Sequence, residues 1–232
     1  MNKNSNDKRL LILLHDSCAL YEWGMICMEK VSRKEREYQM RREEILKAAE
    51  KIFAQNGFYN STVAEIAKES EFAIGTLYQF FTNKEELYYT MMIEKFDLLY
   101  EMLQSKVSEH SRCMDKLGCV VEVVLSFIEQ NVDFFKIFTW ELNVLNSNMN
   151  NQLKDQLISK HFAYIKLISD IITEGIQEGL LKDGPADDLS TALVGMMNIF
   201  SFNWIYNQQQ DALRSKAPTI VNLFLNGATQ VK

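Results

Sequence analysis

Proline and glycine are scarce in this chain, which has 2 prolines and 9 glycines among 232 residues. Both residues disfavour the interior of a helix, proline through its missing N–H group and glycine through its backbone freedom. Their scarcity therefore favours long, uninterrupted helices. From Cys113 onward no alternating strand pattern persists, and apolar residues recur at helical spacing. The 47% hydrophobic content is enough for one sizeable core, or for a small domain joined to a larger one.

The sequence also lacks the groupings of residues that make metal, disulfide and catalytic sites. None of its 4 cysteines lies in a C-x-x-C pair, and its 3 histidines are far apart. We infer neither a zinc site nor a disulfide framework, and expect free thiols in a reducing cytosol. No histidine accompanies a nucleophile motif, and no carboxylate–histidine spacing suits a metal. We therefore expect neither an enzyme nor a cofactor.

Long apolar runs and an excess of positive charge are absent as well. The apolar run Leu10–Leu14 is interrupted by His15 and Asp16, so it is too short to span a bilayer. No cleavage site of small residues follows it, as a signal peptide would require. We expect a cytoplasmic protein with no membrane partner. The net charge of −6 argues against a protein that coats nucleic acid, although it leaves room for a local basic patch.

The stretch from Thr62 to Lys84 carries the most informative pattern in the chain. Apolar residues share one face of a first short helix and one face of a second, namely Val63, Ile66 and Ala67, then Leu77 and Phe81. This is the layout of a helix-turn-helix, whose second helix enters the major groove of DNA. Its outward face holds small and hydrogen-bonding residues, which are Gly75, Thr76, Tyr78 and Gln79. Any two amphipathic helices around a turn share this pattern, so the residues alone leave DNA binding and simple packing both open.

The same segment closely resembles the DNA-binding domain of the TetR family of bacterial transcriptional regulators. The family pattern is roughly T-x-x-x-I-A-x-x-A-G-V-S-x-G-T-L/I/V-Y-x-Y/H-F-x-x-K-x-x-L. The positions that fit are Thr62, Ile66, Ala67, Gly75, Thr76, Leu77, Tyr78, Phe81, Lys84 and Leu87. The match departs at the turn. There Glu71 replaces a glycine and has to accept a strained backbone, and Ala73 replaces the usual hydroxyl cap.

The resemblance implies that this unit binds a double-stranded DNA operator. The implied interface comprises Thr62, Ala73, Ile74, Gly75, Thr76, Tyr78, Gln79 and Lys84. Within it we expect Tyr78 and Lys84 to hold phosphates. Thr76 and Gln79 lie on the outward face, where they can reach base edges. Thr62 would also cap the first helix of the pair.

We predict an all-α fold with two domains. A three-helix helix-turn-helix DNA-binding domain spans residues 35–84, and a larger helical ligand-binding and dimerisation domain spans residues 85–232. Residues 1–34 form an N-terminal extension that we expect to be poorly ordered or misassigned; the alternative is an extra helix packed on the domain. Residues 30–42 hold six basic side chains against two acidic ones. That composition suits an arm that reaches DNA phosphates, or equally a solvated helix start.

Aromatic and methionine side chains crowd the middle of the larger domain. The resemblance implies a pocket there for a small apolar or amphipathic ligand. Its candidate residues are Phe127, Phe135, Phe138, Trp140, Phe162 and Met197. An aromatic stripe of this kind is more often part of an ordinary core. Just before this domain, Asn83 with Glu86 resembles a capping box for a long helix.

The last two long helices offer apolar faces that could pair with a second copy of the chain, as such helices do in the TetR family. The candidates are Ala192, Gly195, Met196, Ile199 and Phe200, then Val221, Phe224 and Leu225. The alternative is that these residues form the core of a single subunit. We predict a homodimeric, ligand-responsive transcriptional regulator. It should act as a repressor, as most members of the TetR family do, by binding an inverted-repeat operator from which a small apolar molecule releases it. The alternative function is a constitutive DNA-binding dimer without an inducer.

Overall fold

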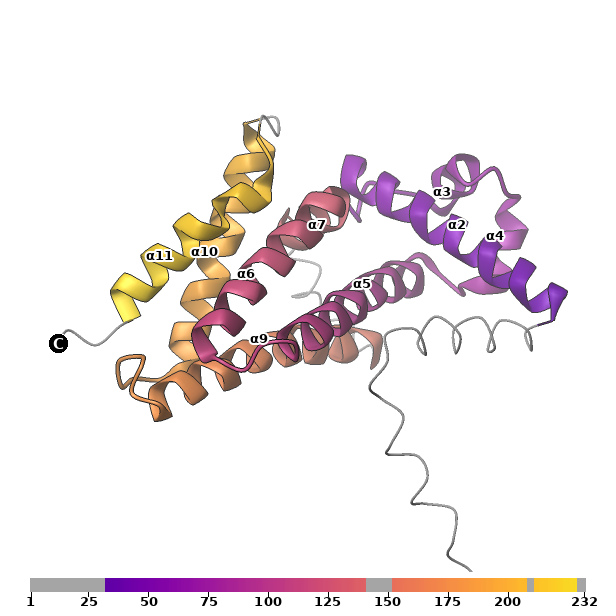
Figure 1. Ribbon diagram of the computed structural model, residues 1–232. Coiled ribbons are helices and arrows are strands. Elements are labelled where there is room, and N and C mark those ends of the chain that lie inside the picture. Colours follow the sequence, from indigo (N-terminus) through magenta and orange to yellow (C-terminus); the bar gives the residue numbers. More distant parts are fainter. Residues whose placement is uncertain (1–31, 141–151, 208–210, 229–232) are drawn as a thin grey trace, which may run out of the picture. The chain divides into compact units, whose positions relative to one another are not determined.

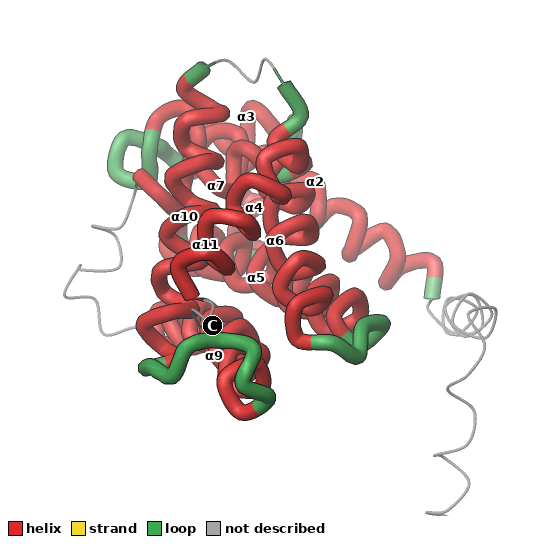
Figure 2. The backbone as a smooth tube through the Cα atoms, turned by 60° about the vertical axis from the view of Figure 1, so that its left-hand side comes forward, coloured by secondary structure: helices red, strands yellow, loops and turns green. Residues whose placement is uncertain are grey.

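The computed structural model describes residues 32–140, 152–207 and 211–228. Every regular element in these ranges is a helix, which confirms the all-α prediction. Figure 1 follows the helices along the chain, and Figure 2 shows them from a second side. The N-terminal extension expected over residues 1–34 lies outside the described residues, apart from residues 32–34.

The segment that contains the helix-turn-helix comprises α2 (Arg33–Asn56), α3 (Val63–Glu69), α4 (Ile74–Phe80) and α5 (Lys84–Val107). The rest comprises α6 (Cys113–Gln130), α7 (Val132–Trp140), α9 (Gln152–Gln177), α10 (Ala186–Tyr206), the 3-10 helix η1 (Leu213–Lys216) and α11 (Ala217–Ala228). Apolar periodicity and turn residues determine these limits, and both can be read from sequence.

Helix α2 changes character near Glu44. Beyond that residue its apolar side chains are buried at helical spacing, namely Ile45, Ala48, Ala49, Ile52 and Phe53. Before it the side chains are mostly exposed, and pairs within the helix join Arg33 to Glu37 at 2.8 Å and Gln39 to Glu35 at 2.9 Å. Each such pair contributes about 0.2–0.5 kcal/mol. Only the later turns of α2 are therefore tied to a hydrophobic core.

The larger domain is built around α9, which packs against α5, α6 and α10. Helix α11 packs against α6 and α10, so it covers the far side of the same core. Figures 1 and 2 show these helices side by side. Within the described ranges, no helix combines the length and the apolar character that crossing a membrane requires.

Helices α6 and α9 approach each other closely where Gly175 faces Cys113. A Cβ atom at position 175 would lie 2.5 Å from the Sγ atom of Cys113 and 2.9 Å from the Cδ1 atom of Leu181. Real Cβ atoms do not come that close to other heavy atoms, so glycine is required for the packing of these two helices.

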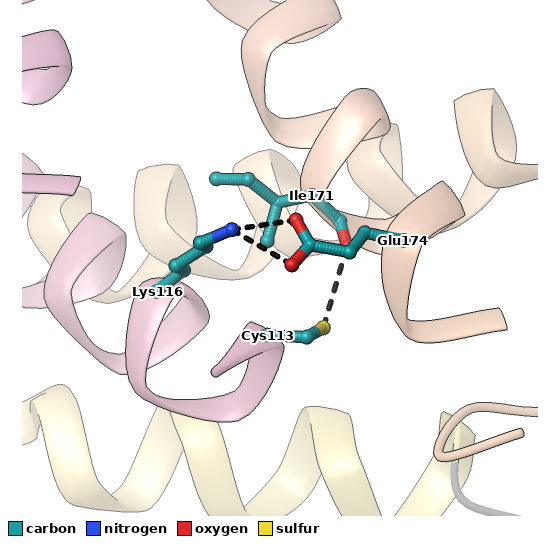
Figure 3. Close-up of polar contacts among 4 residues, drawn as sticks. All are labelled: Cys113, Lys116, Ile171 and Glu174. Carbon is teal, nitrogen blue, oxygen red and sulfur yellow. Dashed lines mark hydrogen bonds and ion pairs between the residues drawn. The ribbon is translucent and has the colours of Figure 1, made fainter. Parts of the chain in front are cut away.

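Polar contacts join the same two helices, as Figure 3 shows. The Cys113 thiol donates to the carbonyl oxygen of Ile171 at 3.3 Å, and the Lys116 ammonium contacts both carboxylate oxygens of Glu174 at 2.6 and 2.7 Å. Burial raises the pKa of the Cys113 thiol to about 11, and the carboxylates of Glu174 and Glu178 add to the effect. The thiol therefore stays protonated and contributes to packing. The described part of the chain holds no group of three metal-ligating side chains.

Helix α10 is apolar on two faces. Leu193, Val194, Met197 and Trp204 lie on the inward face and are buried. A second stripe follows alternating spacings of three and four residues and is exposed along its length, namely Ala192, Gly195, Ile199, Phe202 and Tyr206. The exposed fractions are 54% for Ile199 and 78% for Tyr206. An apolar stripe of this spacing is typical of a helix that packs against another helix.

The pairing face expected on α11 needs correction. Phe224 is only 5% exposed and belongs to the core of the single chain, whereas its neighbour Leu223 is 52% exposed. Four other expected members are half-buried, namely Met196, Phe200, Val221 and Leu225. Adjacent helical residues point about 100° apart, so a small error in the assigned face exchanges a buried residue for an exposed one.

Candidate DNA interface and ligand cavity

Helix α3 begins with a reciprocal capping box at Thr62. The Thr62 hydroxyl accepts a hydrogen bond from the backbone N–H of Glu65 at 3.2 Å, and the Glu65 carboxylate accepts one from the backbone N–H of Thr62 at 2.8 Å. The hydroxyl also donates to that carboxylate, and these bonds lower the pKa of Glu65, the hydroxyl bond having the largest effect. Thr62 is therefore confirmed as a cap. A contact from its hydroxyl proton to a DNA phosphate would have to replace the bond to Glu65.

The turn between α3 and α4 contains a residue in the left-handed region. The backbone φ of Glu71 is 59°, which costs a non-glycine residue roughly 1–2 kcal/mol. This confirms the strain expected where the family pattern has glycine. Helix α4 then starts after Ala73, whose side chain supplies no capping bond. The turn closes nevertheless, because the backbone N–H of Phe72 donates to the carbonyl of Ala67 at 3.0 Å.

Helix α4 holds most of the expected DNA-contacting residues at the surface. Leu77 is buried and anchors the helix to the domain core. The exposed members are Ala73, Ile74, Gly75, Tyr78 and Gln79, while Thr76 is half-buried. A Cβ atom at Gly75 would meet no described atom within 4 Å, so packing within this chain does not require glycine there. The missing side chain matters only to a molecule that approaches from outside, as a DNA backbone would.

The ammonium of Lys84 is bonded within the domain. It donates to the carbonyl oxygens of Phe58 at 2.7 Å and Ser61 at 2.8 Å, and lies 4.4 Å from the centroid of the Phe58 ring. A lysine ammonium has three protons, so one remains for another acceptor. In the structure this ammonium holds the loop that precedes α3, and the phosphate contact expected of Lys84 stays a prediction.

Of the two bonds that make up the capping box expected at the start of α5, only one is formed. The side chain of Asn83 accepts a bond from the backbone N–H of Glu86 at 2.7 Å. The Glu86 carboxylate, however, accepts bonds from the backbone N–H of Thr82 at 2.7 Å and from the Thr82 hydroxyl at 2.5 Å. Thr82 offers two donors to one carboxylate, which explains why the expected bond to the Asn83 backbone is not the one formed.

We expect Gln79→Ala to lower operator affinity by about 1–3 kcal/mol and to relax the preference at one base position of each half-site. Gln79 is exposed on α4, and its amide can form paired hydrogen bonds with adenine. The matched variant is Tyr78→Phe, which removes one hydroxyl from the same helix and should weaken operator and scrambled DNA alike. Both affinities can be measured by fluorescence anisotropy. Equal losses on the two DNAs for Gln79→Ala would contradict the assignment.

A narrow, partly open space of about 30 Å³ lies within the larger domain. Its lining comes from α5, α6, α7, α9 and α10, and is mostly aromatic. Phe127, Phe135 and Phe138, which the sequence singled out, line this space. Met197 is fully buried but is not part of the lining, and Phe162 is 62% exposed and also outside it. The side chain of Trp140 lies outside the described residues.

The cavity is smaller than a ligand. One water in the liquid occupies about 30 Å³, whereas small-molecule sites span about 300–1,000 Å³. A larger hollow of about 580 Å³ lies between α6 and α11, but it is open to solvent and polar residues such as Glu122 and Asn222 line part of it. Ligand sites bury most of the ligand, so the less open, aromatic space is the better candidate. A ligand could enter it only if the aromatic rings moved apart.

Three polar side chains interrupt the aromatic lining, namely His161, Tyr164 and Asn198. The imidazole of His161, on α9, lies with its centroid 5.4 Å from that of Phe138 and 5.8 Å from that of Phe96. Its Nδ1 atom is buried and has no hydrogen-bond partner within the described ranges. Burial lowers the pKa of His161, so the ring is neutral near pH 7. Sequence reasoning missed this residue because a single histidine belongs to no motif.

A polar network connects the cavity to the last turns of α2. The Lys95 ammonium lies 3.0 Å from the Glu50 carboxylate and donates to the side-chain oxygen of Asn131 at 2.7 Å. Asn131 in turn donates to the carbonyl oxygen of Phe127 at 2.8 Å. The exposed fractions of the charged side chains are 24% for Lys95 and 13% for Glu50. Two partly buried charges thus link α2, α5 and the α6–α7 junction, where Phe127 lines the cavity.

Two family models match consecutive parts of the chain. The model described as "Bacterial regulatory proteins, tetR family" matches residues 45–89. The model described as "YsiA-like protein, C-terminal region" matches residues 92–227. The first match contains the helix-turn-helix, and the second contains the cavity and the exposed stripe of α10.

Comparison with individual proteins gives the same picture. The chain is 26% identical to the fatty acid metabolism regulator protein of Bacillus subtilis, over 79% of this chain and 93% of that protein. Its fold is also similar to that of the transcriptional regulator FadR from Bacillus subtilis, whose crystal structure is a complex with stearoyl-CoA. The TM-score is 0.70 and the sequence identity 26%, and the match covers 80% of this chain and 98% of the FadR chain. The ketosteroid regulator KstR2 of Mycobacterium tuberculosis shares the fold, with a TM-score of 0.71, 21% identity, and coverage of 82% and 96%.

Proposed function

Because this chain belongs to the TetR family of bacterial regulatory proteins and is a DNA-binding transcriptional regulator, we propose that it is a homodimeric repressor released by a long-chain fatty acyl-CoA. We infer the identity of the ligand from the similarity to a FadR regulator whose structure holds stearoyl-CoA. The aromatic cavity supports an acyl chain as part of this ligand. Rings such as Phe127 and Phe135 offer an apolar surface, which suits a hydrocarbon chain.

The dimer is supported by the exposed stripe of α10. A second copy would cover Ile199, Phe202 and Tyr206 with the same residues of its own α10, giving a face that is self-complementary about a two-fold axis. Two copies of α4 about 34 Å apart would then read the two halves of an inverted repeat. The pairing therefore connects the larger domain to the symmetry of the operator.

The domain limits fit this division of roles. We place the N-terminal extension at residues 1–34, the DNA-binding domain at residues 35–84 and the ligand-binding and dimerisation domain at residues 85–232. Residues before about Val31 should be dispensable for operator binding. The cytoplasm, where the operator DNA is, would be the site of action.

The size of the cavity bears on how a ligand would release the DNA. With about 30 Å³ of free space, the rings are closed on one another, so an acyl chain can bind only a form in which they have separated. A ligand that binds one form better than the other shifts the population toward it. If the separated form holds the DNA-binding unit differently, ligand binding and operator binding oppose each other, with a typical coupling of about 1–3 kcal/mol.

A second candidate function has this same observation in its favour. A cavity of about 30 Å³ holds no inducer as it stands. A DNA-binding dimer that acts without an inducer would therefore have the same structure. The two functions differ in one measurable property, which is the effect of an acyl-CoA on operator affinity.

We expect stearoyl-CoA to weaken operator binding by roughly 5- to 150-fold. The operator would be selected from a random DNA pool, and its affinity measured by fluorescence anisotropy with and without ligand. Coenzyme A without an acyl chain is the matched control and should have no effect. An inverted-repeat operator bound with equal affinity in the presence and absence of stearoyl-CoA would favour the constitutive dimer.

A further inference from the structure

The unpaired Nδ1 atom of His161 sets the imidazole apart from the other rings of the cavity. Buried polar groups nearly always have a hydrogen-bond partner, and one without a partner lowers stability. Nδ1 has none among the described residues, although it is shielded from solvent. The apolar rings of Phe96 and Phe138 next to it offer no acceptor. A ligand that places a polar atom at this point would supply the missing bond.

His161 also neighbours residues that reach the surface, since Phe162 beside it is 62% exposed. The neighbouring residue on α9, Lys160, forms an ion pair with Asp97, which follows Phe96 on α5; both charged side chains are partly exposed. Phe127 and Phe135, which also line the cavity, are almost fully buried. A ligand lying along the seam of α5 and α9 would therefore meet charged groups, then the imidazole, then apolar rings.

This order of environments matches the order of groups in an acyl-CoA, which are a charged coenzyme, a thioester and a hydrocarbon chain. We propose that His161 donates a hydrogen bond from Nδ1 to the thioester carbonyl and thereby distinguishes acyl-CoA from ligands that lack this carbonyl; this rests on the proposed function. The neutral tautomer with its proton on Nδ1 is required, because a carbonyl oxygen only accepts. A free fatty acid is disfavoured, because its carboxylate would carry a charge into an apolar space.

The test compares two ligands of equal chain length. Stearoyl-CoA carries the carbonyl, and S-octadecyl-CoA is the thioether in which a methylene replaces it. We expect the unmodified protein to bind stearoyl-CoA about tenfold more tightly in isothermal titration calorimetry, the usual size of one neutral hydrogen bond to a buried group. His161→Phe should bind the two ligands with equal affinity. His161→Asn, whose side-chain amide replaces Nδ1 as a donor, should keep the preference.

The controls separate folding from recognition. His110→Phe makes the same change at an exposed histidine before α6 and should keep the tenfold preference. Operator binding without ligand shows that each variant is folded. Equal affinity of the unmodified protein for the two ligands would overturn the assignment of His161 while leaving the proposed function intact. Failure to bind either ligand would overturn both.

Discussion

Replacing Ile199 by glutamate should convert the protein into a monomer that no longer holds its operator. Ile199 is at the centre of the exposed stripe of α10 and is 54% exposed in the single chain, so the change leaves the core of the subunit untouched. In a symmetric dimer the two glutamates would lie close together and be buried, where unpaired like charges are strongly unfavourable. Operator affinity should fall roughly a hundredfold or more, because each subunit must then bind its half-site alone.

Sedimentation velocity and anisotropy on one operator would measure both effects. Leu98→Glu is the matched control, since Leu98 is a comparably exposed apolar residue on α5, away from the stripe. It should leave the dimer and the affinity unchanged. Phe224→Glu is not a useful probe of the dimer, because Phe224 is buried in the single chain and its change would unfold the subunit. A dimer that survives Ile199→Glu would show that another surface pairs the subunits.

Replacing Lys95 by methionine should lower the free energy of unfolding by about 3 kcal/mol. The reason is that Glu50, with 13% of its side chain exposed, loses the ammonium 3.0 Å from its carboxylate and keeps a largely buried charge that this partner no longer compensates. Removing both charges in Glu50→Met/Lys95→Met should restore most of the stability, since a buried ion pair is often replaced by apolar side chains at little net cost. Urea unfolding measures the three values.

The double variant should also lose its response to stearoyl-CoA. It would still bind the ligand, but operator affinity would change less than twofold on addition, compared with the roughly 5- to 150-fold expected of the unmodified protein. The bonds from Phe127 through Asn131 and Lys95 to Glu50 would be broken, so separation of the cavity rings would no longer be coupled to α2. Lys106→Met removes an exposed ion pair with Glu109 and should change neither property. A double variant that responds fully would exclude this network as the coupling element.

The DNA-binding unit was largely predictable because its information is local. Helical spacing places Leu77 inward and Tyr78 and Gln79 outward, and the turn residues locate the strained Glu71. The partner of Lys84 could not be predicted in the same way. Its ammonium reaches a carbonyl 26 positions earlier in the chain, and no periodicity encodes such a contact.

The lining of the aromatic cavity was predictable only in part. Phe127, Phe135 and Phe138 follow from the aromatic content of the middle helices, but Phe162 points to solvent although its sequence neighbours are buried or half-buried. His161 was missed because its significance comes from the rings around it, which belong to other helices. Composition identifies what kinds of side chain are available, whereas the packing of distant helices decides which of them meet.

The bonds of Lys84 have a further consequence for how the protein moves. By holding the carbonyls of Phe58 and Ser61, its ammonium acts as a noncovalent cross-link that closes the segment 58–84 into a ring. Closing a loop removes many of the conformations available to it. Both α3 and α4 lie inside this ring, so they should turn as one rigid body whenever the start of α5 shifts. We therefore expect the two helices to leave the operator together, without an intermediate in which one of them remains on the DNA.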